Sequence, residues 1–541
     1  MARIKKPSAP DFLKMDLNAP GMSPLHRAGL GGLACTLEAL HARQRQDPLP
    51  EERLPAPFVD GTPPWDISAT SITLRFGKPE GAARYLENLF AHAFSIRSDG
   101  LIYLPGQFAQ EPPAAVLADL QQGLLGTFLQ HGGVRQMHKD PTTVSYDPEG
   151  EGIPGVIVQY RACTGFKHQK GWADLVDKKG CIIQGYAKVD GPISPGSVVR
   201  HQAYGSQTMI EEPMERIIPL FFAMVGCLAL PVNRGVTVLL VPEVTDLKEF
   251  IYDRQAMAPG TAKECQISSA ADAALQAQIH IRARKTTGNS IPGCYAMTFT
   301  SKPWASQQKS RVATLQLPPG EEQRLNKFEI ALAHLPIRIA LKKIRESTGK
   351  GKQKTTTERV ESFRADSIVR PLVAENLALG RPWYAGFVNL MIKNNPATDR
   401  PLRDQLSYER GGLHAMITEE KMWDDEGARI VVQAVHRAIQ QTLGRIREET
   451  DGKSGPLSQA TKNRWERFRE RLRLDLVGAK SQAQARFALT DLFSRSGTNA
   501  VLQESWQQIL PIILKDWQLV RDLGLLALAS YASSREQDSN V

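Results

Sequence analysis

This sequence lacks the patterns by which metalloproteins and many enzymes are recognised. Its six cysteines form no C-x-x-C pair, and its eleven histidines form no H-E-x-x-H or H-x-H pattern. No G-x-S-x-G segment is present to form a nucleophile turn. Structural zinc sites require closely spaced ligands. We therefore expect no metal, no cofactor and no catalytic set, and the six isolated thiols are typical of a reducing compartment.

Long apolar segments are also missing. The most apolar tracts, Ile217–Leu230 and Leu523–Ala529, are shorter or more interrupted than the roughly 20 apolar residues of a membrane-spanning helix. At the N-terminus, Arg3, Lys5 and Lys6 are followed by prolines and an aspartate instead of the apolar segment of a secretory signal. We expect a cytoplasmic protein that makes no use of a membrane.

What the sequence does have is positive charge. Its 541 residues carry a net charge of +10, with 42% hydrophobic and 23% charged residues, and the isoelectric point is about 9.2. The length allows two or three globular domains. A basic balance favours polyanionic partners through the release of counterions, although many basic proteins bind no nucleic acid.

The N-terminal two thirds predict an α+β body. Ser23 and Pro24 are typical of a helix start and predict a helix over Leu25–Arg43. Two further helices are expected at Gly81–His92 and Ala114–Gln130. Short β-branched runs separated by Gly, Pro and Asn predict strands, at Val156–Tyr160, Cys181–Ala187, Val236–Val241, Gln278–Ala283, Ala296–Thr300 and Val312–Leu317.

The C-terminal third predicts a helical bundle. We expect a helix over Glu321–Glu346, a Gly/Lys/Thr-rich loop over Ser347–Arg359, and helices from Ser362 almost to the end. The fold class is therefore α+β: a mixed α/β N-terminal body with antiparallel β segments (1–375), then an all-α helical bundle (376–541).

A glycine run near the N-terminus, at Gly29, Gly31 and Gly32, has two interpretations. Glycine-rich loops can surround phosphate groups, but here no Lys-Ser/Thr follows and no clear strand precedes. Close packing of a helix against a neighbour is the favoured interpretation.

One helix of the bundle is rich in arginine. In Lys462–Lys480, Trp465, Phe468, Leu472 and Leu476 follow helical spacing, and arginines cover the remaining surface. Its acidic residues are too few to neutralise them, so a polyanion is favoured over a merely solvated face with Arg–Glu pairs. The candidate contacts are Arg464, Arg467 and Arg471.

Two basic loops give further candidates. The loop at 347–359 offers Lys350, Lys352 and Lys354 to phosphates, and a solvated loop without a partner is an almost equal alternative. Lys285–Ser290 is a polar tip in which Lys285 and Asn289 have side chains suited to base edges. A third polar, basic loop is expected over Arg135–Gly150.

Three stretches resemble a known family. Asp16–Leu30 (DLNAPGMSPLHRAGL) is similar to the opening of the large subunits of type I CRISPR effector complexes, in particular the Myxococcus-type variants of subtype I-B. Trp65–Ile67 with Gly100–Gly106 (GLIYLPG) is similar to a second block of that family. Gly380–Tyr384 (GRPWY) and the stretch from Asp516 to Leu528 resemble its helical region.

The resemblance implies a non-catalytic subunit of an RNA-guided DNA surveillance complex (Cascade). Its partners would be the CRISPR guide RNA, target double-stranded DNA, the backbone and small subunits, and a helicase–nuclease. Such large subunits read the short flanking motif (PAM), contact the 5′ end of the RNA and help to hold the opened strands of the R-loop in antiviral defence. The C-terminal bundle resembles the small subunit.

Two other classes remain open from the residues alone: a nucleic-acid-processing enzyme with a dispersed active site, and a pure assembly protein. A separate small subunit translated from Met416, with Met391 or Met422 as substitutes, is a further hypothesis. Met416 as an ordinary core methionine is at least as favoured.

Overall fold

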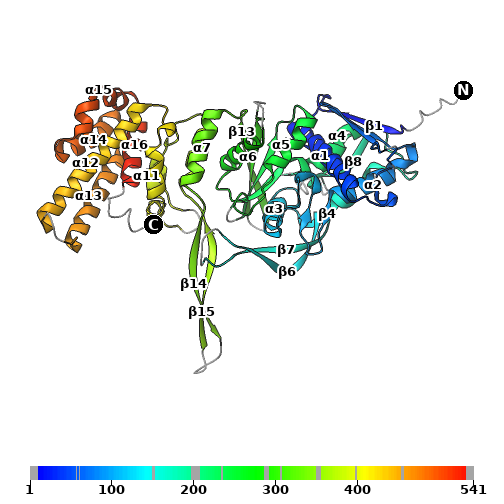
Figure 1. The fold of residues 1–541 in the computed structure, drawn as a ribbon, viewed down its shortest axis with the longest axis horizontal. Coiled ribbons are helices and arrows are strands. Elements are labelled where there is room, and N and C mark those ends of the chain that lie inside the picture. Colours follow the sequence, from blue (N-terminus) through cyan, green and yellow to red (C-terminus); the bar gives the residue numbers. More distant parts are fainter. Residues whose placement is uncertain are drawn as a thin grey trace. The chain divides into compact units, whose positions relative to one another are not determined.

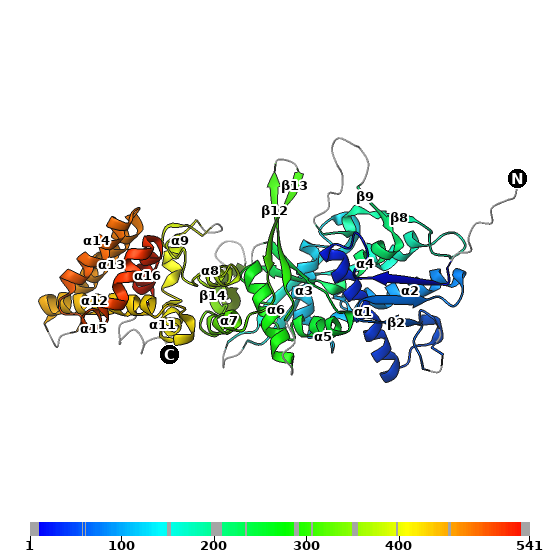
Figure 2. The same cartoon turned by 90° about the horizontal axis from the view of Figure 1, so that it is seen from above.

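A computed structural model shows how the chain is arranged (Figures 1 and 2). It divides into a first unit, Met1–Gly320 with Ile339–Ala365, and a second unit, Glu321–Arg338 with Asp366–Val541. The structure describes residues 10–56, 58–59, 61–148, 153–195, 208–232, 235–285, 291–304, 307–348, 355–395, 399–452 and 456–531.

Two four-stranded sheets form most of the β structure. One is an antiparallel meander in the order β10-β11-β12-β13, and the other has the order β14-β15-β7-β6. Its strands β6 and β7 are antiparallel, while β15 meets β7 in the parallel direction. The larger strands are β6 (Arg135–Tyr146), β7 (Val156–Phe166), β10 (Leu228–Val232), β11 (Val236–Pro242), β12 (Cys294–Trp304), β13 (Gln307–Leu317), β14 (Arg338–Thr348) and β15 (Thr355–Ala365).

Smaller antiparallel sheets complete the first unit. A three-stranded sheet has the order β1-β3-β2, and β4-β5 and β8-β9 are two-stranded. Their strands are β1 (Phe12–Asp16), β2 (Trp65–Ile67), β3 (Ser71–Arg75), β4 (Ser95–Ile96), β5 (Ile102–Tyr103), β8 (Tyr186–Asp190) and β9 (Met209–Pro213). The main helices are α1 (Pro24–Gln46), α2 (Ala82–Ala93), α3 (Ala114–Gly126), α4 (Met214–Gly226), α5 (Leu247–Met257) and α6 (Ala270–Arg284).

Glycines let α1 lie directly against α4. A Cβ atom on Gly29 would overlap the carbonyl oxygen of Pro219, and one on Gly226 would overlap that of Ala28. Backbone therefore meets backbone where the two helices cross. The packing interpretation of the glycine run is confirmed, and α1 begins at the predicted Ser23 cap.

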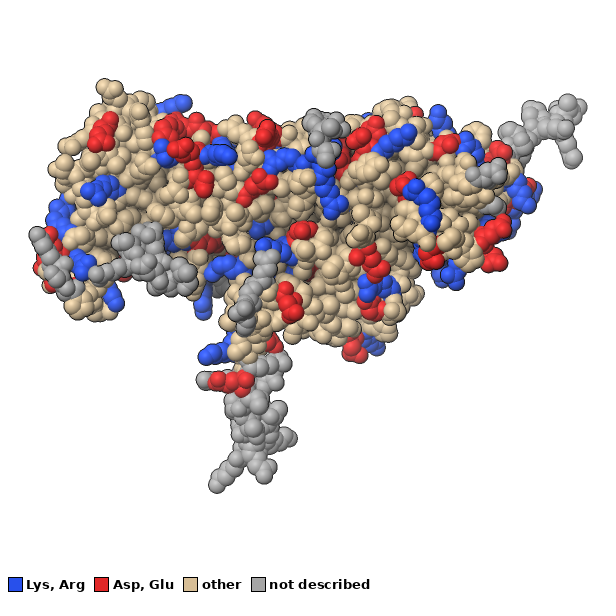
Figure 3. Space-filling model, in the orientation of Figure 1, with Lys and Arg blue, Asp and Glu red and all other residues tan. Residues whose placement is uncertain are grey.

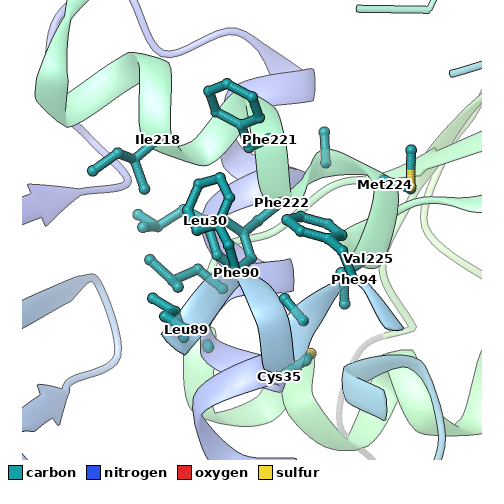
Figure 4. Packing of buried hydrophobic residues seen from close by; sticks show 14 of the residues in the cluster. Leu30, Cys35, Leu89, Phe90, Phe94, Ile218, Phe221, Phe222, Met224 and Val225 are labelled. Carbon is teal, nitrogen blue, oxygen red and sulfur yellow. The ribbon is translucent and has the colours of Figure 1, made fainter. Parts of the chain in front are cut away.

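Aromatic rings fill the core beside this crossing (Figure 4). Phe90 of α2 lies 5.3 Å from Phe221 and Phe222 of α4 and 5.5 Å from Phe94, measured between ring centroids. All four rings and Leu30 of α1 are almost completely buried. Edge-to-face geometry suits the ring quadrupoles and adds to the free energy gained by burial.

The strands β14 and β15 form a long two-stranded arm (Figure 1). At its base, Arg364 binds the buried Asp119 of α3 with two hydrogen bonds of 3.0 and 2.7 Å. The same guanidinium donates to Tyr146 Oη at 3.1 Å and lies over its ring. Burial alone would lower the pKa of Arg364, but the bonds to Asp119 raise it overall. The guanidinium thus fixes β15 to α3 and β6.

The second unit is helical. In it α12 packs against α13, α14, α15 and α16. Asp425, Ser458, Ser481, Asn499 and Asp516 are the N-caps of these five helices, and each side chain accepts a backbone N–H. The helices are α7 (Glu322–His334), α8 (Arg370–Ala378), α9 (Val388–Ile392), α10 (Arg403–Leu406), α11 (Arg410–Thr418), α12 (Glu426–Asp451), α13 (Gln459–Gly478), α14 (Gln482–Ser496), α15 (Ala500–Lys515) and α16 (Trp517–Ser530).

The expected fold class, an α+β body followed by a helical bundle, is confirmed. Some elements were predicted wrongly. Gln278–Ala283 is helical, because it continues the alanine-rich α6 that Ser269 caps. The expected helix Glu321–Glu346 ends at His334, since Pro336 follows, and the rest is strand β14.

The expected basic loop at Arg135–Gly150 is wrong over most of its length, and the one at 347–359 is wrong at its two ends. Most of Arg135–Gly150 is strand β6, whose Thr142 and Val144 pair with Tyr160 and Val158 of β7. The ends of 347–359 belong to β14 and β15, and residues 349–354 lie outside the described ranges.

Candidate nucleic-acid interface

The arginine-rich helix is α13. Leu472 and Leu476 are buried on its inner side, and the Trp465 indole Nε1 donates to Leu443 O of α12 at 3.0 Å. These contacts fix which side of α13 faces outward. The helix carries six basic and three acidic residues, so its net charge is positive.

Ion pairs hold most of these arginines. Arg464 lies 2.8 Å from Glu449 of α12 and also donates to Thr450. Arg471 lies 3.9 Å from Asp475, and both side chains are largely exposed. Arg467 is exposed and has no carboxylate within 4 Å among the described residues. Exposed pairs of this kind contribute at most about 1 kcal/mol, so a phosphate can compete with them.

The other two arginines of α13 pair within the helix. Arg469 lies 3.3 Å from Glu466. Arg473 is buried and binds Glu470 through two hydrogen bonds of 2.8 and 2.6 Å, which raise the pKa of Arg473. These pairs give Arg469 and Arg473 a structural role within α13.

A cleft of about 590 Å³ is lined by residues of α11, α12, α13 and α15 and by Tyr531. We call it the α12–α13 cleft. None of the described residues that line it is acidic, and its polar lining includes His414, Gln433, His436, Arg437, Gln440 and Arg447. Trp465 of α13 also lines it. Arginine, amide and aromatic side chains without carboxylates suit a nucleotide, because they meet both phosphate and base.

Two histidines form one wall of this cleft. The rings of His414 and His436 stack at 5.9 Å with 10° between their planes. His436 Nε2 contacts Ala527 O at 2.9 Å and Ser530 Oγ at 3.1 Å. Burial, and then the neighbouring His414, lower the pKa of His436 to about 4. His436 is therefore neutral at physiological pH and adds no charge to the cleft.

Sequence reasoning missed this cleft, although a signal was present. Arg437, Gln440, Gly444 and Arg447 recur at i, i+3, i+7 and i+10 along one side of α12. At Gly444 no atom lies within 4 Å of the place a Cβ would take, so the helix surface is bare there.

Lys285 lies at the end of α6, where its Nζ pairs with Asp253 of α5 at 3.0 Å. Only 16% of its side chain is exposed. In the chain by itself this lysine therefore joins α6 to α5. Its partner candidate Asn289 lies outside the described residues, as do Lys350, Lys352 and Lys354.

Elsewhere the cations are mixed with acids. Figure 3 shows lysine and arginine interspersed with aspartate and glutamate over the face in view. In a groove of about 420 Å³ beside β6 and β7, Arg135 donates to backbone carbonyls of Leu125 and Leu129, and Lys167 pairs with Asp190. On the arm, Lys342 and Lys343 are exposed.

Within the described ranges, no three His, Cys, Asp or Glu side chains are grouped so that they could hold a metal ion. None of the helices there combines the length and apolarity needed to cross a bilayer.

Two domain families match this architecture of body and bundle. Residues 14–221 match the DevT N-terminal domain, and residues 419–541 match the DevT C-terminal domain, which corresponds to α12 to α16. A similar protein is the CRISPR-associated protein Cas8a1/Csx13 of Myxococcus xanthus (strain DK1622). It is 33% identical, over 97% of this chain and 90% of the relative.

The chain is thus of the class that combines a DevT-type N-terminal domain with a DevT-type helical C-terminal domain. With this identity over nearly its whole length, it belongs to the Cas8a1/Csx13 family of CRISPR-associated proteins.

Proposed function

We propose that this chain is the non-catalytic large subunit of a Cascade-type CRISPR effector complex of the I-B type, acting in the cytoplasm. The observation that carries the proposal is the similarity to a Cas8a1/Csx13 protein from one end of the chain to the other. The cleft without acidic lining and the basic surface of α13 support a role in holding nucleic acid.

In this role the guide RNA supplies sequence recognition by pairing with the target strand. The large subunit reads the PAM, contacts the 5′ end of the RNA and steadies the displaced strand. We assign the strand contact to Arg464, Arg467 and Arg471 with the α12–α13 cleft. The large subunit also provides the surface to which a helicase–nuclease docks.

The experiment is reconstitution with the backbone subunits and a guide RNA. We expect tight binding of duplex DNA only when the target matches the guide and carries the correct flanking motif. Omission of this chain should abolish the dependence on the flanking motif. Equal binding of matched and unmatched duplexes by the complete complex would contradict the proposal.

The PAM reader is tested separately with Lys285→Ala and Asn289→Ala. Each variant is screened against a library of flanking sequences, and a changed motif preference at unchanged guide pairing is expected. Lys285→Ala also removes the pair with Asp253, so Asn289→Ala is the cleaner of the two. An unchanged preference in both would place the reader elsewhere, with β6 and the segment after it as the next candidate.

Two rival functions predict different results. A processing enzyme would cleave DNA or RNA when incubated with this chain alone, and a pure assembly protein would support complex formation without changing DNA affinity. The presence of a repeat–spacer array and backbone-subunit genes beside this gene would favour the proposed function.

A further inference from the structure

A small pocket in the second unit combines aromatic rings with carboxylates. Its volume is about 220 Å³, below the roughly 300–1,000 Å³ of ordinary small-molecule sites. It therefore has room for about one long side chain. We call it the Trp383 pocket, and its lining includes Trp383, Tyr384, Trp423, Asp424, Asp425 and Asp516.

Three rings make its rigid wall. The ring of Trp383 lies 5.6 Å from Trp423 and 5.7 Å from Tyr384, which is itself 5.7 Å from Trp423. All three are more than nine-tenths buried. The Trp423 Nε1 donates to Ile417 O at 3.1 Å. The buried Trp383 Nε1 has no acceptor among the described residues.

Two carboxylates of the pocket are fixed by helix caps. Asp425 Oδ1 accepts from Gly427 N at 2.9 Å, and Asp516 Oδ1 accepts from Gln518 N and Leu519 N at 2.9 and 3.3 Å. In both residues Oδ2 accepts no hydrogen bond from a described residue and the side chain is exposed. Each carboxylate thus has one oxygen held in place and one available.

The remaining charged residues of the lining give the pocket a net negative charge. Asp424 is already bound to the buried Lys327, and Lys515 is the one basic residue among the described residues of the lining. Asp425 and Asp516 therefore outweigh Lys515. A phosphate would be repelled. Among the described residues, no three His, Cys, Asp or Glu side chains are grouped so that they could hold a metal ion. The negative charge beside aromatic rings therefore favours an organic cation as the occupant.

We propose that the Trp383 pocket receives an arginine side chain of another protein. A guanidinium can lie against the aromatic rings and donate in its plane to the free oxygens of Asp425 and Asp516. This contact goes beyond the proposed function, because it needs no nucleic acid.

The test uses the full chain and N-acetyl-arginine amide as the probe, with N-acetyl-citrulline amide as its uncharged counterpart. Saturation-transfer NMR titration should show binding of the arginine probe and at least about tenfold weaker binding of citrulline, since hydrogen bonds to charged groups are the stronger ones.

Asp425→Asn with Asp516→Asn is the decisive variant. Asparagine caps a helix as well as aspartate does, so the fold should be retained while the charge is lost, and affinity for the arginine probe should fall at least about tenfold. Asp246→Asn, at the cap of α5 in the first unit, is the matched control and should change nothing. Lys515→Gln should strengthen binding.

Equal binding of arginine and citrulline, no detectable binding of either, or an affinity untouched by the double Asn variant would overturn the proposal. Competition by adenosine monophosphate would instead identify a base-binding pocket and also overturn it. Guide-dependent DNA binding is measured in parallel, so failure of the pocket and failure of the proposed function give separate results.

Discussion

His168 shows how a buried residue contributes to the response of the first unit to pH. It is fully buried, with the rings of Phe94, Phe166 and Phe221 5.5–6.1 Å away. Neither ring nitrogen has a partner among the described residues. Burial lowers the pKa of His168 to about 3, so the folded unit holds it neutral.

Replacing His168 by Leu should flatten the acid dependence of stability. Below pH 6.5 the unfolded chain binds a proton that the folded chain excludes, so stability is lost as pH falls from 6.5 towards 3, on the order of 5 kcal/mol in total. Any packing cost of leucine is independent of pH. Urea unfolding at several pH values measures the slope, and the exposed His138→Leu is the control. An unchanged slope in His168→Leu would contradict the burial argument.

Replacing a glycine by alanine should lower the stability of the protein in one helix and raise it in another. Gly29→Ala places a Cβ on the carbonyl of Pro219, so it should lower stability by about 2 kcal/mol or more. Gly444→Ala meets open space and should raise stability by about 0.5–1 kcal/mol through helix propensity. Thermal unfolding of the two variants checks this; a loss at both sites would contradict the close approach of α1 and α4.

At the scale of elements, the local signal that starts α1 was read well, whereas pairings between distant segments were not. Ser23 and Pro24 predicted the start of α1, because a cap acts within one turn. The strand β14 was missed because its pairing with β15 overrides the helical pattern that precedes it. Likewise, the pair between Arg464 and Glu449 joins two helices, so the charge pattern of α13 alone could not reveal that Arg464 already has a partner.

The base of the arm gives a prediction at this scale. Asp119→Ala leaves the guanidinium of Arg364 without its carboxylate, and breaking such a buried pair should cost about 3 kcal/mol. Amide exchange along β15 should then accelerate, as hydrogen-exchange mass spectrometry can measure. The exposed pair of Lys188 and Glu211 is the control, because Glu211→Ala should cost less than about 1 kcal/mol. Equal effects would mean that Arg364 does not anchor the arm.

For the whole molecule, the net charge of +10 is less informative than the places where its positive side chains lie. Arginines of α13 are mostly paired, whereas the α12–α13 cleft has no acidic lining among the described residues. Met416, the hypothetical internal start, is fully buried in α11, as a core methionine would be. The C-terminal domain match begins just after it, at residue 419, so separate translation stays a prediction.

Two variants that each remove three positive charges distinguish the effect of charge position on DNA binding from the effect of total charge. The combination Arg464→Gln, Arg467→Gln and Arg471→Gln should weaken DNA binding by the assembled complex at every sequence. It should also reduce the slope of log affinity against log salt by about 2, since each lost phosphate contact removes roughly 0.7–0.9. Filter binding over a range of salt concentrations measures both.

The control combination, Lys421→Gln, Lys480→Gln and Arg495→Gln, removes exposed cations elsewhere in the second unit and should leave the slope within about 0.5 of the unmodified chain. Arg467→Gln alone is the cleanest single change, because it frees no carboxylate, whereas Arg464→Gln also leaves Glu449 unpaired. If both triple variants shift the slope equally, only net charge matters. If neither does, the arginines of α13 contact a neighbouring subunit.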